Sequence, residues 1–199
     1  MIPSLVLRAL RATGRPRFFD EAGRPLLGGE AHGQGFLLTD PKTSELLVLT
    51  VAHLATSASE VELAGRDVKQ GVVRGSLRVA PGHIDPVNDI VAFAALGDGP
   101  ALSLATREPA VSDPLFVLSA TVHPGSVAHV SDEGLFVVEL EEGLDADVIE
   151  GCVGAPIVNA AGNVVGLCVG TRMSPTGRPW LTSPRLLVLR VVLAGPQSA

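Results

Sequence analysis

Cysteine is scarce in this chain, which has only Cys152 and Cys168 among 199 residues. Two cysteines are too few for the dense disulfide framework of a small secreted domain. Neither belongs to a C-x-x-C pair, so the usual spacing of a structural zinc site is also missing. A single disulfide between the two remains geometrically open, and packing as a small apolar residue is the expected role of Cys168.

Long hydrophobic runs are also missing. No stretch approaches the roughly 18 apolar residues that a membrane-spanning helix needs. The first eight residues, 1–8, hold an apolar run of only three residues before an arginine, which is too short for the core of a signal peptide. The sequence therefore predicts a cytoplasmic protein with no membrane partner.

Positive charge is limited as well. The chain has 15 basic and 21 acidic residues and a formal net charge of −6. A surface for nucleic acid needs a basic stripe, which this balance argues against. The densest basic stretch, from Arg8 to Arg24, is interrupted by Asp20 and Glu21, so we expect a solvated first strand and turn there. Nucleic acid is therefore not an expected partner.

What the chain does have is a series of short apolar runs separated by turns, with 22 glycines and 15 prolines. About ten strands and at most one or two helices predict an all-β protein built of antiparallel barrels. A break rich in proline and small residues near 98–112 divides the chain into two units, 1–105 and 106–199. The expected strands cover residues 35–39, 45–50, 71–79, 89–94, 115–118, 126–130, 135–140, 155–158 and 164–169.

The end of the chain, residues 183–193, is the main candidate for a helix. Ser183 and Pro184 supply an N-cap and a first-turn proline. The β-branched residues that follow keep a strand open as the competing interpretation.

Three short motifs follow one another in an order that suggests hydrolytic chemistry. Thr50-Val51-Ala52-His53 ends an apolar run, Asn88-Asp89-Ile90-Val91 places an aspartate 36 residues later, and Gly151-Cys152-Val153-Gly154-Ala155-Pro156 begins 62 residues after that aspartate. A serine peptidase needs a nucleophile, an imidazole that takes its proton, and a carboxylate that orients the imidazole. The first two motifs contain an imidazole and a carboxylate in that order.

The three motifs together resemble the chymotrypsin/trypsin-like serine peptidase family, whose motifs read TAAH, NDIAL and GDSGGP. The resemblance covers residues from about 33 to 170 and implies two perpendicular six-stranded β-barrels with the site in the crevice between them. It implies that His53 is the general base, Asp89 the orienting carboxylate, and that the N–H groups of Gly151 and Val153 form the oxyanion hole. Val153 occupies the nucleophile position.

A valine side chain carries no atom that can attack a carbonyl group. Removing the nucleophile of a catalytic triad costs on the order of 10⁶-fold in kcat. The sequence therefore predicts a catalytically inactive peptidase homologue, a pseudopeptidase that works as a protein- or peptide-binding or regulatory module. His53 and Asp89 would then remain as a structural hydrogen bond, and a purely structural adaptor without a groove ligand stays open.

The alternative is an active hydrolase with Cys152 as nucleophile beside His53 and Asp89. Cys152 stands one position early, so its side chain is expected to point away from His53 unless the loop is remodelled. A thiol at a glycine-rich turn can nevertheless have a lowered pKa. A small buried residue is the other reading of this cysteine.

The remaining polar residues point to no cofactor or metal. Gly33-Gln34-Gly35 precedes a strand, whereas a nucleotide-binding loop precedes a helix. His83 and Asp85 near Asp89 lack a second ligand pair of known spacing. His123 and His129 are expected to be exposed beside a hairpin. The acidic stretch 139–147 is expected to be a solvated loop or a docking patch. Trp180 is expected to pack against other apolar residues or to form a pocket wall.

Overall fold

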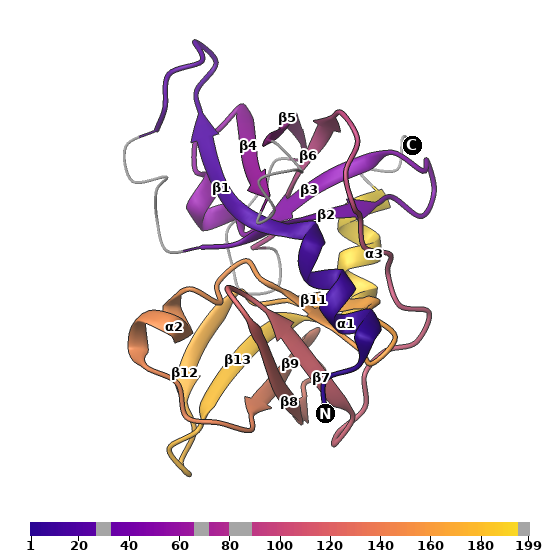
Figure 1. Cartoon of the computed structure of the whole chain (residues 1–199), viewed down its shortest axis with the longest axis vertical. Helices are drawn as coiled ribbons and strands as arrows, with labels where there is room; N and C mark the ends of the chain where they lie inside the picture. Colours follow the sequence, from indigo (N-terminus) through magenta and orange to yellow (C-terminus); the bar gives the residue numbers. More distant parts are fainter. Residues whose placement is uncertain (27–32, 66–71, 80–88, 195–199) are drawn as a thin grey trace.

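The first half of the chain forms a closed antiparallel barrel. The structure, a computed structural model, describes residues 1–26, 33–65, 72–79 and 89–194. The barrel order is β1-β2-β3-β6-β5-β4 (Figure 1). β2, which follows Gly33, is therefore the neighbour of β3, which precedes His53. Its strands are β1 (Thr13–Phe19), β2 (Gly35–Thr39), β3 (Leu46–Thr50), β4 (Glu60–Gly65), β5 (Val72–Val79) and β6 (Val91–Leu96).

The second half forms a curled antiparallel sheet below the barrel in Figure 1. Its strand order is β11-β10-β7-β8-β9-β13-β12, so β12 and β11 are the two edges. The expected all-β architecture with two antiparallel sheets is confirmed, but this sheet has seven strands where six were expected. The strands are β7 (Pro114–Leu118), β8 (Val122–Val130), β9 (Leu135–Leu140), β10 (Pro156–Val158), β11 (Val164–Leu167), β12 (Gly170–Met173) and β13 (Pro179–Pro184).

Short helices join or flank the strands. They are α1 (Ser4–Ala9), the 3-10 turns η1 (Leu10–Ala12) and η2 (Ala52–Ala55), α2 (Ala146–Glu150) and α3 (Leu186–Ala194). The start of the basic stretch, expected to be extended, is helical as far as Ala12, and only β1 has the expected form. The predicted boundary after residue 105 falls in the connection between β6 and β7.

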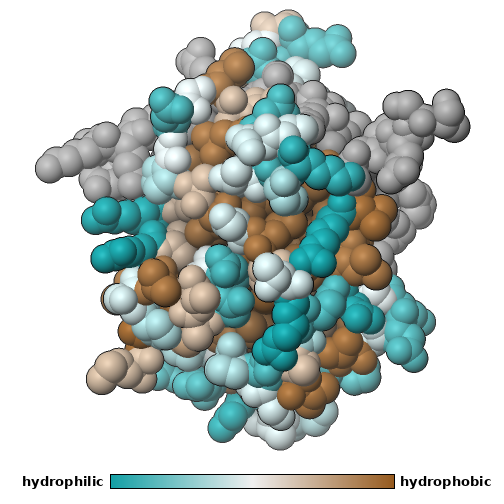
Figure 2. Space-filling view, turned by 90° about the vertical axis from the view of Figure 1, so that its right-hand side faces the viewer, coloured by the Kyte–Doolittle hydropathy of each residue, from teal (hydrophilic) through white to brown (hydrophobic). Residues whose placement is uncertain are grey.

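The segment from residue 179 onward contains both a strand and a helix, the two structures that the sequence left open for residues 183–193. β13 continues through Ser183 to Pro184, and α3 begins two residues later. The helix buries Leu186, Leu189 and Leu193, spaced to lie on one face, against the two cores. Its opposite face leaves Leu187 and Val191 exposed, and hydrophobic side chains gather on this side of the molecule (Figure 2).

Two hydrophobic clusters hold the fold together. The first joins barrel residues such as Phe36 and Phe93 to Val158 and Leu167 of the second sheet, so the two halves share a core. Successive residues of a strand point to opposite faces, and Phe36, Leu37 and Leu38 are all buried. Both faces of β2 are therefore covered. No helix in the described ranges has the length and apolar character needed to cross a membrane.

Candidate functional site

The barrel brings His53 and Asp89 together although 36 residues separate them. β3 and β6 are antiparallel neighbours, and Thr50 pairs with Val91. Asp89 lies two residues before Val91, where β6 begins, and His53 lies in the turn η2 just after β3. Because adjacent antiparallel strands bring one strand's end beside the other's start, the two side chains meet at one rim of the barrel.

Asp89 holds His53 by both of its carboxylate oxygens. Oδ1 accepts the backbone N–H of His53 at 2.8 Å, and Oδ2 lies 2.5 Å from Nδ1 of the ring. The carboxylate is buried, with 6% of its side chain exposed, whereas 41% of the histidine side chain is exposed. With Nδ1 held in this way, the other ring nitrogen, Nε2, is on the edge turned away from Asp89. This is the arrangement of an oriented base.

The hydrogen bond that the His53 ring donates to the Asp89 carboxylate raises the pKa of His53 above its ordinary value of 6.5, while partial burial opposes the rise. A raised pKa in the folded state favours the protonated form there. The resulting stabilisation is fully present below about pH 6.5, the unfolded value, and is lost as the pH rises through the higher folded pKa.

We expect Asp89→Asn to lower the pKa of His53 below its wild-type value, because the charged acceptor is gone and burial still disfavours the imidazolium. The check is a titration of the histidine ring protons by NMR. His123, which is buried in the second sheet, serves as the internal control and should titrate alike in both proteins. An unchanged His53 titration in Asp89→Asn would show that the carboxylate does not set it.

The segment from Gly151 to Pro156 continues the turns of α2. The N–H of Gly151 donates to the carbonyl oxygen of Asp147 at 3.0 Å, and the N–H of Val153 donates to that of Glu150 at 3.1 Å. Both N–H groups that the resemblance assigns to an oxyanion hole therefore already have acceptors within their own turns. In this geometry they do not point together at an external oxygen.

Val153 and Gly154 attach this segment to the barrel. The carbonyl of Val153 accepts the N–H of Gln34 at 2.7 Å, and its half-buried side chain packs against the first core. Gly154 has φ +80°, and a Cβ atom there would lie 2.1 Å from the carbonyl oxygen of Gln34. That oxygen also accepts the hydroxyl of Thr50 at 2.8 Å. Only glycine satisfies both this conformation and this close approach.

The two cysteines lie in the core of the second sheet. Both are free thiols and neither is exposed. The thiol of Cys152 donates to the carbonyl oxygen of Val148 at 3.3 Å. Burial raises the pKa of Cys152, while a hydrogen bond with Ser119 opposes the rise. Burial also raises the pKa of Cys168. Cys152 belongs to the second hydrophobic cluster, whereas His53 is partly exposed at the barrel rim.

Burial of His123 differs from the sequence expectation, whereas His129 is exposed as expected. Residues of β8 alternate between buried and partly exposed positions, and the register turns His123 inward. Its Nε2 lies 2.7 Å from the hydroxyl oxygen of Ser119, which is also buried. Burial lowers the pKa of His123 and so favours the neutral ring, while the charge of Glu142 opposes this effect. The sequence carried no signal for this pairing beyond strand alternation.

His83 and Asp85 lie outside the described residues. Within the described ranges, no group of three or more histidine, cysteine or acidic side chains could hold a metal ion. Trp180 on β13 is half-buried, with the guanidinium of Arg172 4.9 Å from its ring centre, so it packs beside the sheet edge.

A closed barrel joined to a second antiparallel sheet, with an oriented histidine at the rim between them, is the architecture of trypsin-like peptidases. Residues 33–167 match the family model of the trypsin-like peptidase domain. The chain belongs to this family, and the resemblance to chymotrypsin/trypsin-like peptidases is confirmed.

Comparison with individual proteins agrees with the family assignment. HhoA of Synechocystis sp., a protein that carries the name of a serine protease, is 28% identical over 158 residues, covering 73% of this chain and 38% of HhoA. The chain thus spans less than two fifths of that relative's length. Two solved structures share the fold, at TM-scores of 0.65 and 0.64.

The first of these structures is the Rv3671c protease of M. tuberculosis in its inactive form, at 15% identity over 100% of this chain and 98% of that one. The active form of the same protease matches with a TM-score of 0.64, so overall shape does not distinguish the two states. The second is the HtrA-type protease AlgW with a decapeptide, at 19% identity over 96% of this chain and 66% of that one.

Proposed function

We propose that this protein is a catalytically inactive homologue of trypsin-like peptidases that binds a peptide or protein segment, as a binding or regulatory module. The observation that carries the proposal is Val153. It occupies the nucleophile position of the family, and its aliphatic side chain packs against the barrel core. A carbonyl substrate would meet no attacking atom there, although His53 and Asp89 are arranged to accept a proton.

The bonding of the neighbouring N–H groups supports the same conclusion. Removing one oxyanion-hole donor typically costs about 10²–10³-fold in kcat. The N–H groups of Gly151 and Val153 both donate to backbone carbonyls of α2. The loop would have to unwind before it could stabilise an oxyanion.

The environment of Cys152 favours packing over nucleophilic catalysis. A reactive thiol needs a lowered pKa and access to solvent or substrate. Cys152 has a raised pKa, is fully buried, and donates its S–H to a backbone carbonyl. The alternative of a cysteine hydrolase therefore has no supporting feature among the described residues.

For the binding activity, the edge strand β12 provides the best surface. It pairs with β13 on one side only, which leaves backbone groups on the other side for an added strand. At Gly170, a Cβ atom would meet nothing within 4 Å, so the space over the face of the sheet at the start of β12 is open, and a bulky side chain there would crowd a strand added at this edge. The AlgW structure contains a decapeptide, and a decapeptide-sized segment is the ligand class that we propose here.

The proposal extends to a protein or peptide as the partner and to the cytoplasm as the location. Two features support a protein or peptide partner. The edge of β12 can pair with an added strand, and a scaffold with Val153 at the nucleophile position could still bind a peptide that it does not cleave.

Panning a random decapeptide library against the protein tests the binding activity. We expect peptides that bind wild type and bind Gly170→Trp about tenfold or more weakly, because the indole would project over the face at the start of β12 and crowd the side chains of an added strand. Gly143→Trp is the matched control, since a Cβ atom at Gly143 also meets nothing within 4 Å. The selected peptides should remain intact on prolonged incubation. Cleavage that disappears in His53→Ala would overturn the assignment as an inactive homologue, and equal weakening by both tryptophan variants would remove β12 as the surface.

A further inference from the structure

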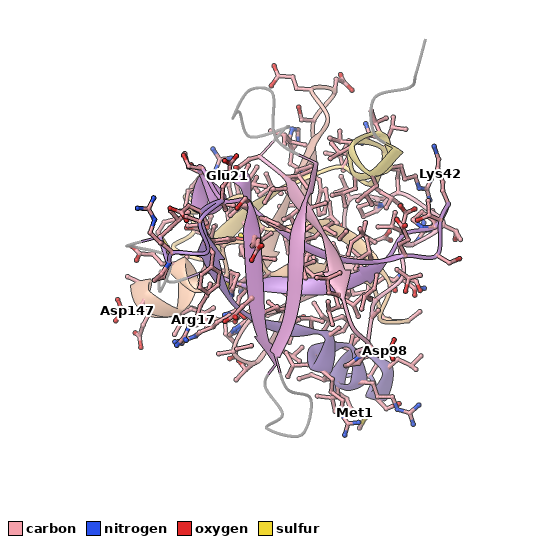
Figure 3. The ribbon with its side chains drawn as sticks, turned by 90° about the horizontal axis from the view of Figure 1, so that it is seen from above. Met1, Arg17, Glu21, Lys42, Asp98 and Asp147 are labelled. Carbon is pink, nitrogen blue, oxygen red and sulfur yellow. The ribbon has the colours of Figure 1, made fainter. Side chains whose placement is uncertain are left out.

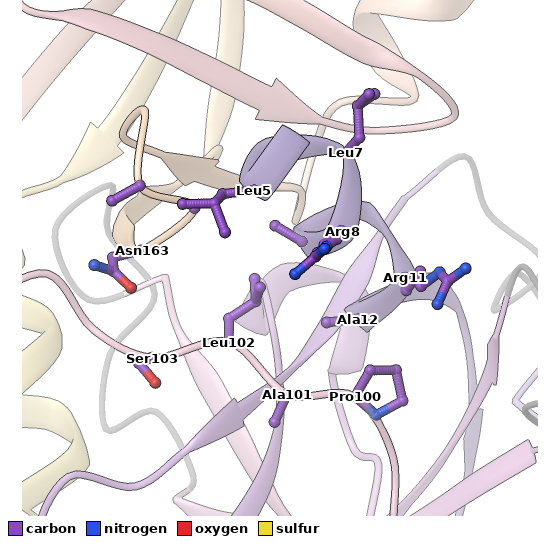
Figure 4. A pocket seen from close by; sticks show the side chains of 13 residues that line it. Leu5, Leu7, Arg8, Arg11, Ala12, Pro100, Ala101, Leu102, Ser103 and Asn163 are labelled. Atoms are coloured by element: carbon purple, nitrogen blue, oxygen red, sulfur yellow. The ribbon is translucent and has the colours of Figure 1, made fainter. Parts of the chain in front are cut away.

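A groove separate from the His53 site lies between α1, the connection 100–103 and the hairpin that joins β10 to β11. It has a volume of about 850 Å³, and none of its lining residues belongs to the site described above. Figure 4 shows the side chains around it, with Leu5 and Leu102 near the centre and Arg8 and Arg11 along one side. Its size is within the range of ligand-binding pockets.

Close packing between α1 and the hairpin forms one wall of this groove. Gly162 in the hairpin has φ +79°, and a Cβ atom there would lie 3.0 Å from the carbonyl oxygen of Leu5 and 3.6 Å from Cβ of Ala9. Val6 and Ala9 lie on the buried face of α1. Leu102, with 4% exposure, is paired with β2 through backbone hydrogen bonds. The groove is therefore supported on several sides by the folded core.

The ionisable side chains that line the groove are both basic. Arg8 and Arg11, three residues apart along the helical turns, are exposed, and within the described part of the chain neither forms an ion pair. Asp98, two residues before Pro100 at the rim, is the acidic residue nearest to the lining along the chain. This local positive charge stands on a chain whose net charge is −6.

Apolar surface accompanies the two arginines. Leu5 is 48% exposed and Leu7 is 51% exposed, although both are aliphatic side chains on a short helix. A partner that covers them would remove apolar area from water and gain the hydrophobic contribution of that area. The hollow shape of the site suits a chain segment better than a flat surface.

We propose that this groove binds an acidic peptide that carries aliphatic side chains. Its carboxylates pair with Arg8 and Arg11, and its aliphatic groups cover Leu5 and Leu7. The protein's own acidic helix α2 does not fill the groove, because Asp147 of α2 and Met1 lie on different sides of the molecule (Figure 3). The groove is a second binding surface, independent of β12 and of the His53 site.

The test is fluorescence anisotropy with a labelled peptide in which glutamate and leucine alternate. We expect binding that weakens about tenfold or more in the double variant Arg8→Glu/Arg11→Glu. The matched control is Arg15→Glu/Arg17→Glu, which changes the net charge equally at exposed positions on β1 and should change the affinity less than about twofold. A peptide with glutamine in place of glutamate should bind about tenfold more weakly.

Hydrogen exchange gives a second readout that does not depend on the variants. Amides of residues 4–12 and 159–163 should gain protection when the glutamate–leucine peptide is added. In the separate anisotropy measurement, His53→Ala and Gly170→Trp should bind the peptide with the affinity of wild type. Equal weakening by the two arginine pairs, equal affinity for the glutamine peptide, or no binding at about 1 mM peptide would overturn the proposal. Binding of anionic lipid vesicles that needs Arg8 and Arg11, without peptide binding, would reassign the groove to a membrane surface.

Discussion

Replacing Val153 with serine is expected to leave the protein about 10⁴-fold or more below an intact serine peptidase toward the same ester substrate. The new hydroxyl would occupy the position that the family's nucleophile takes, but the N–H groups of Gly151 and Val153 are bonded to backbone carbonyls of α2. Each missing oxyanion donor costs about 10²–10³-fold, so two account for this loss. The measurement is ester hydrolysis and labelling by a fluorophosphonate probe, with trypsin assayed in parallel.

The matched control for Val153→Ser is the double variant Val153→Ser/His53→Ala. If the loop keeps its bonding to α2, the two proteins should differ by less than about tenfold, because the effects of groups that act as one catalytic unit are strongly non-additive when part of the unit is missing. Rapid labelling of Val153→Ser that disappears in the double variant would mean that the loop unwinds readily. The bonding of Gly151 and Val153 would then not be what limits the activity of this variant.

Replacing Gly154 with alanine is expected to destabilise the fold by about 3 kcal/mol or more. The alanine Cβ would lie 2.1 Å from the carbonyl oxygen of Gln34. This backbone cannot move away freely, because the carbonyl oxygen accepts the hydroxyl of Thr50 and the N–H of Gln34 donates to the carbonyl of Val153. Overpacking typically costs 1–3 kcal/mol, and a non-glycine residue at positive φ adds about 1 kcal/mol or more. Urea unfolding followed by circular dichroism measures the change in the free energy of unfolding.

Gly143→Ala is the control for this substitution. Gly143 lies in the loop before α2, where an added Cβ meets nothing within 4 Å, and it does not require positive φ. The same change in composition should therefore alter the free energy of unfolding by less than about 1 kcal/mol. If Gly154→Ala proved as mild as Gly143→Ala, the contact between this segment and Gln34 would be looser than the structure indicates.

Much of the strand pattern was predictable because each strand is short and bounded by turn residues. β2 begins and ends at the predicted residues, Gly35 and Thr39, and the helix α3 overlaps the predicted segment 183–193 and continues one residue beyond it, to Ala194. The N-terminal helix was not predicted, because Ser4–Ala9 is only six residues long and lacks a side-chain cap. Such a short helix is stabilised by packing of Val6 and Ala9 rather than by local sequence preference.

The candidate site divides in a similar way. The order and context of His53 and Asp89 identified a pair that the barrel brings into hydrogen-bond contact. The orientation of Cys152 and the burial of His123 depend on which face of a turn or strand meets the core, and a single sequence does not specify this. Arg8 and Arg11 of the α1 groove lie in a stretch whose sequence predicts a solvated strand and turn, whereas the structure places them on helical turns.

The amino-acid sequence by itself determined the chemical inventory of this protein: a histidine and an aspartate in trypsin-like order, and Val153 at the position that the resemblance assigns to the nucleophile. These follow from residue identity and need no coordinates. Only the tertiary structure decided where backbone N–H groups, thiols and exposed arginines point. Their directions depend on long-range packing between the barrel, the second sheet and the helices, because residues far apart in the chain supply the partners that orient them.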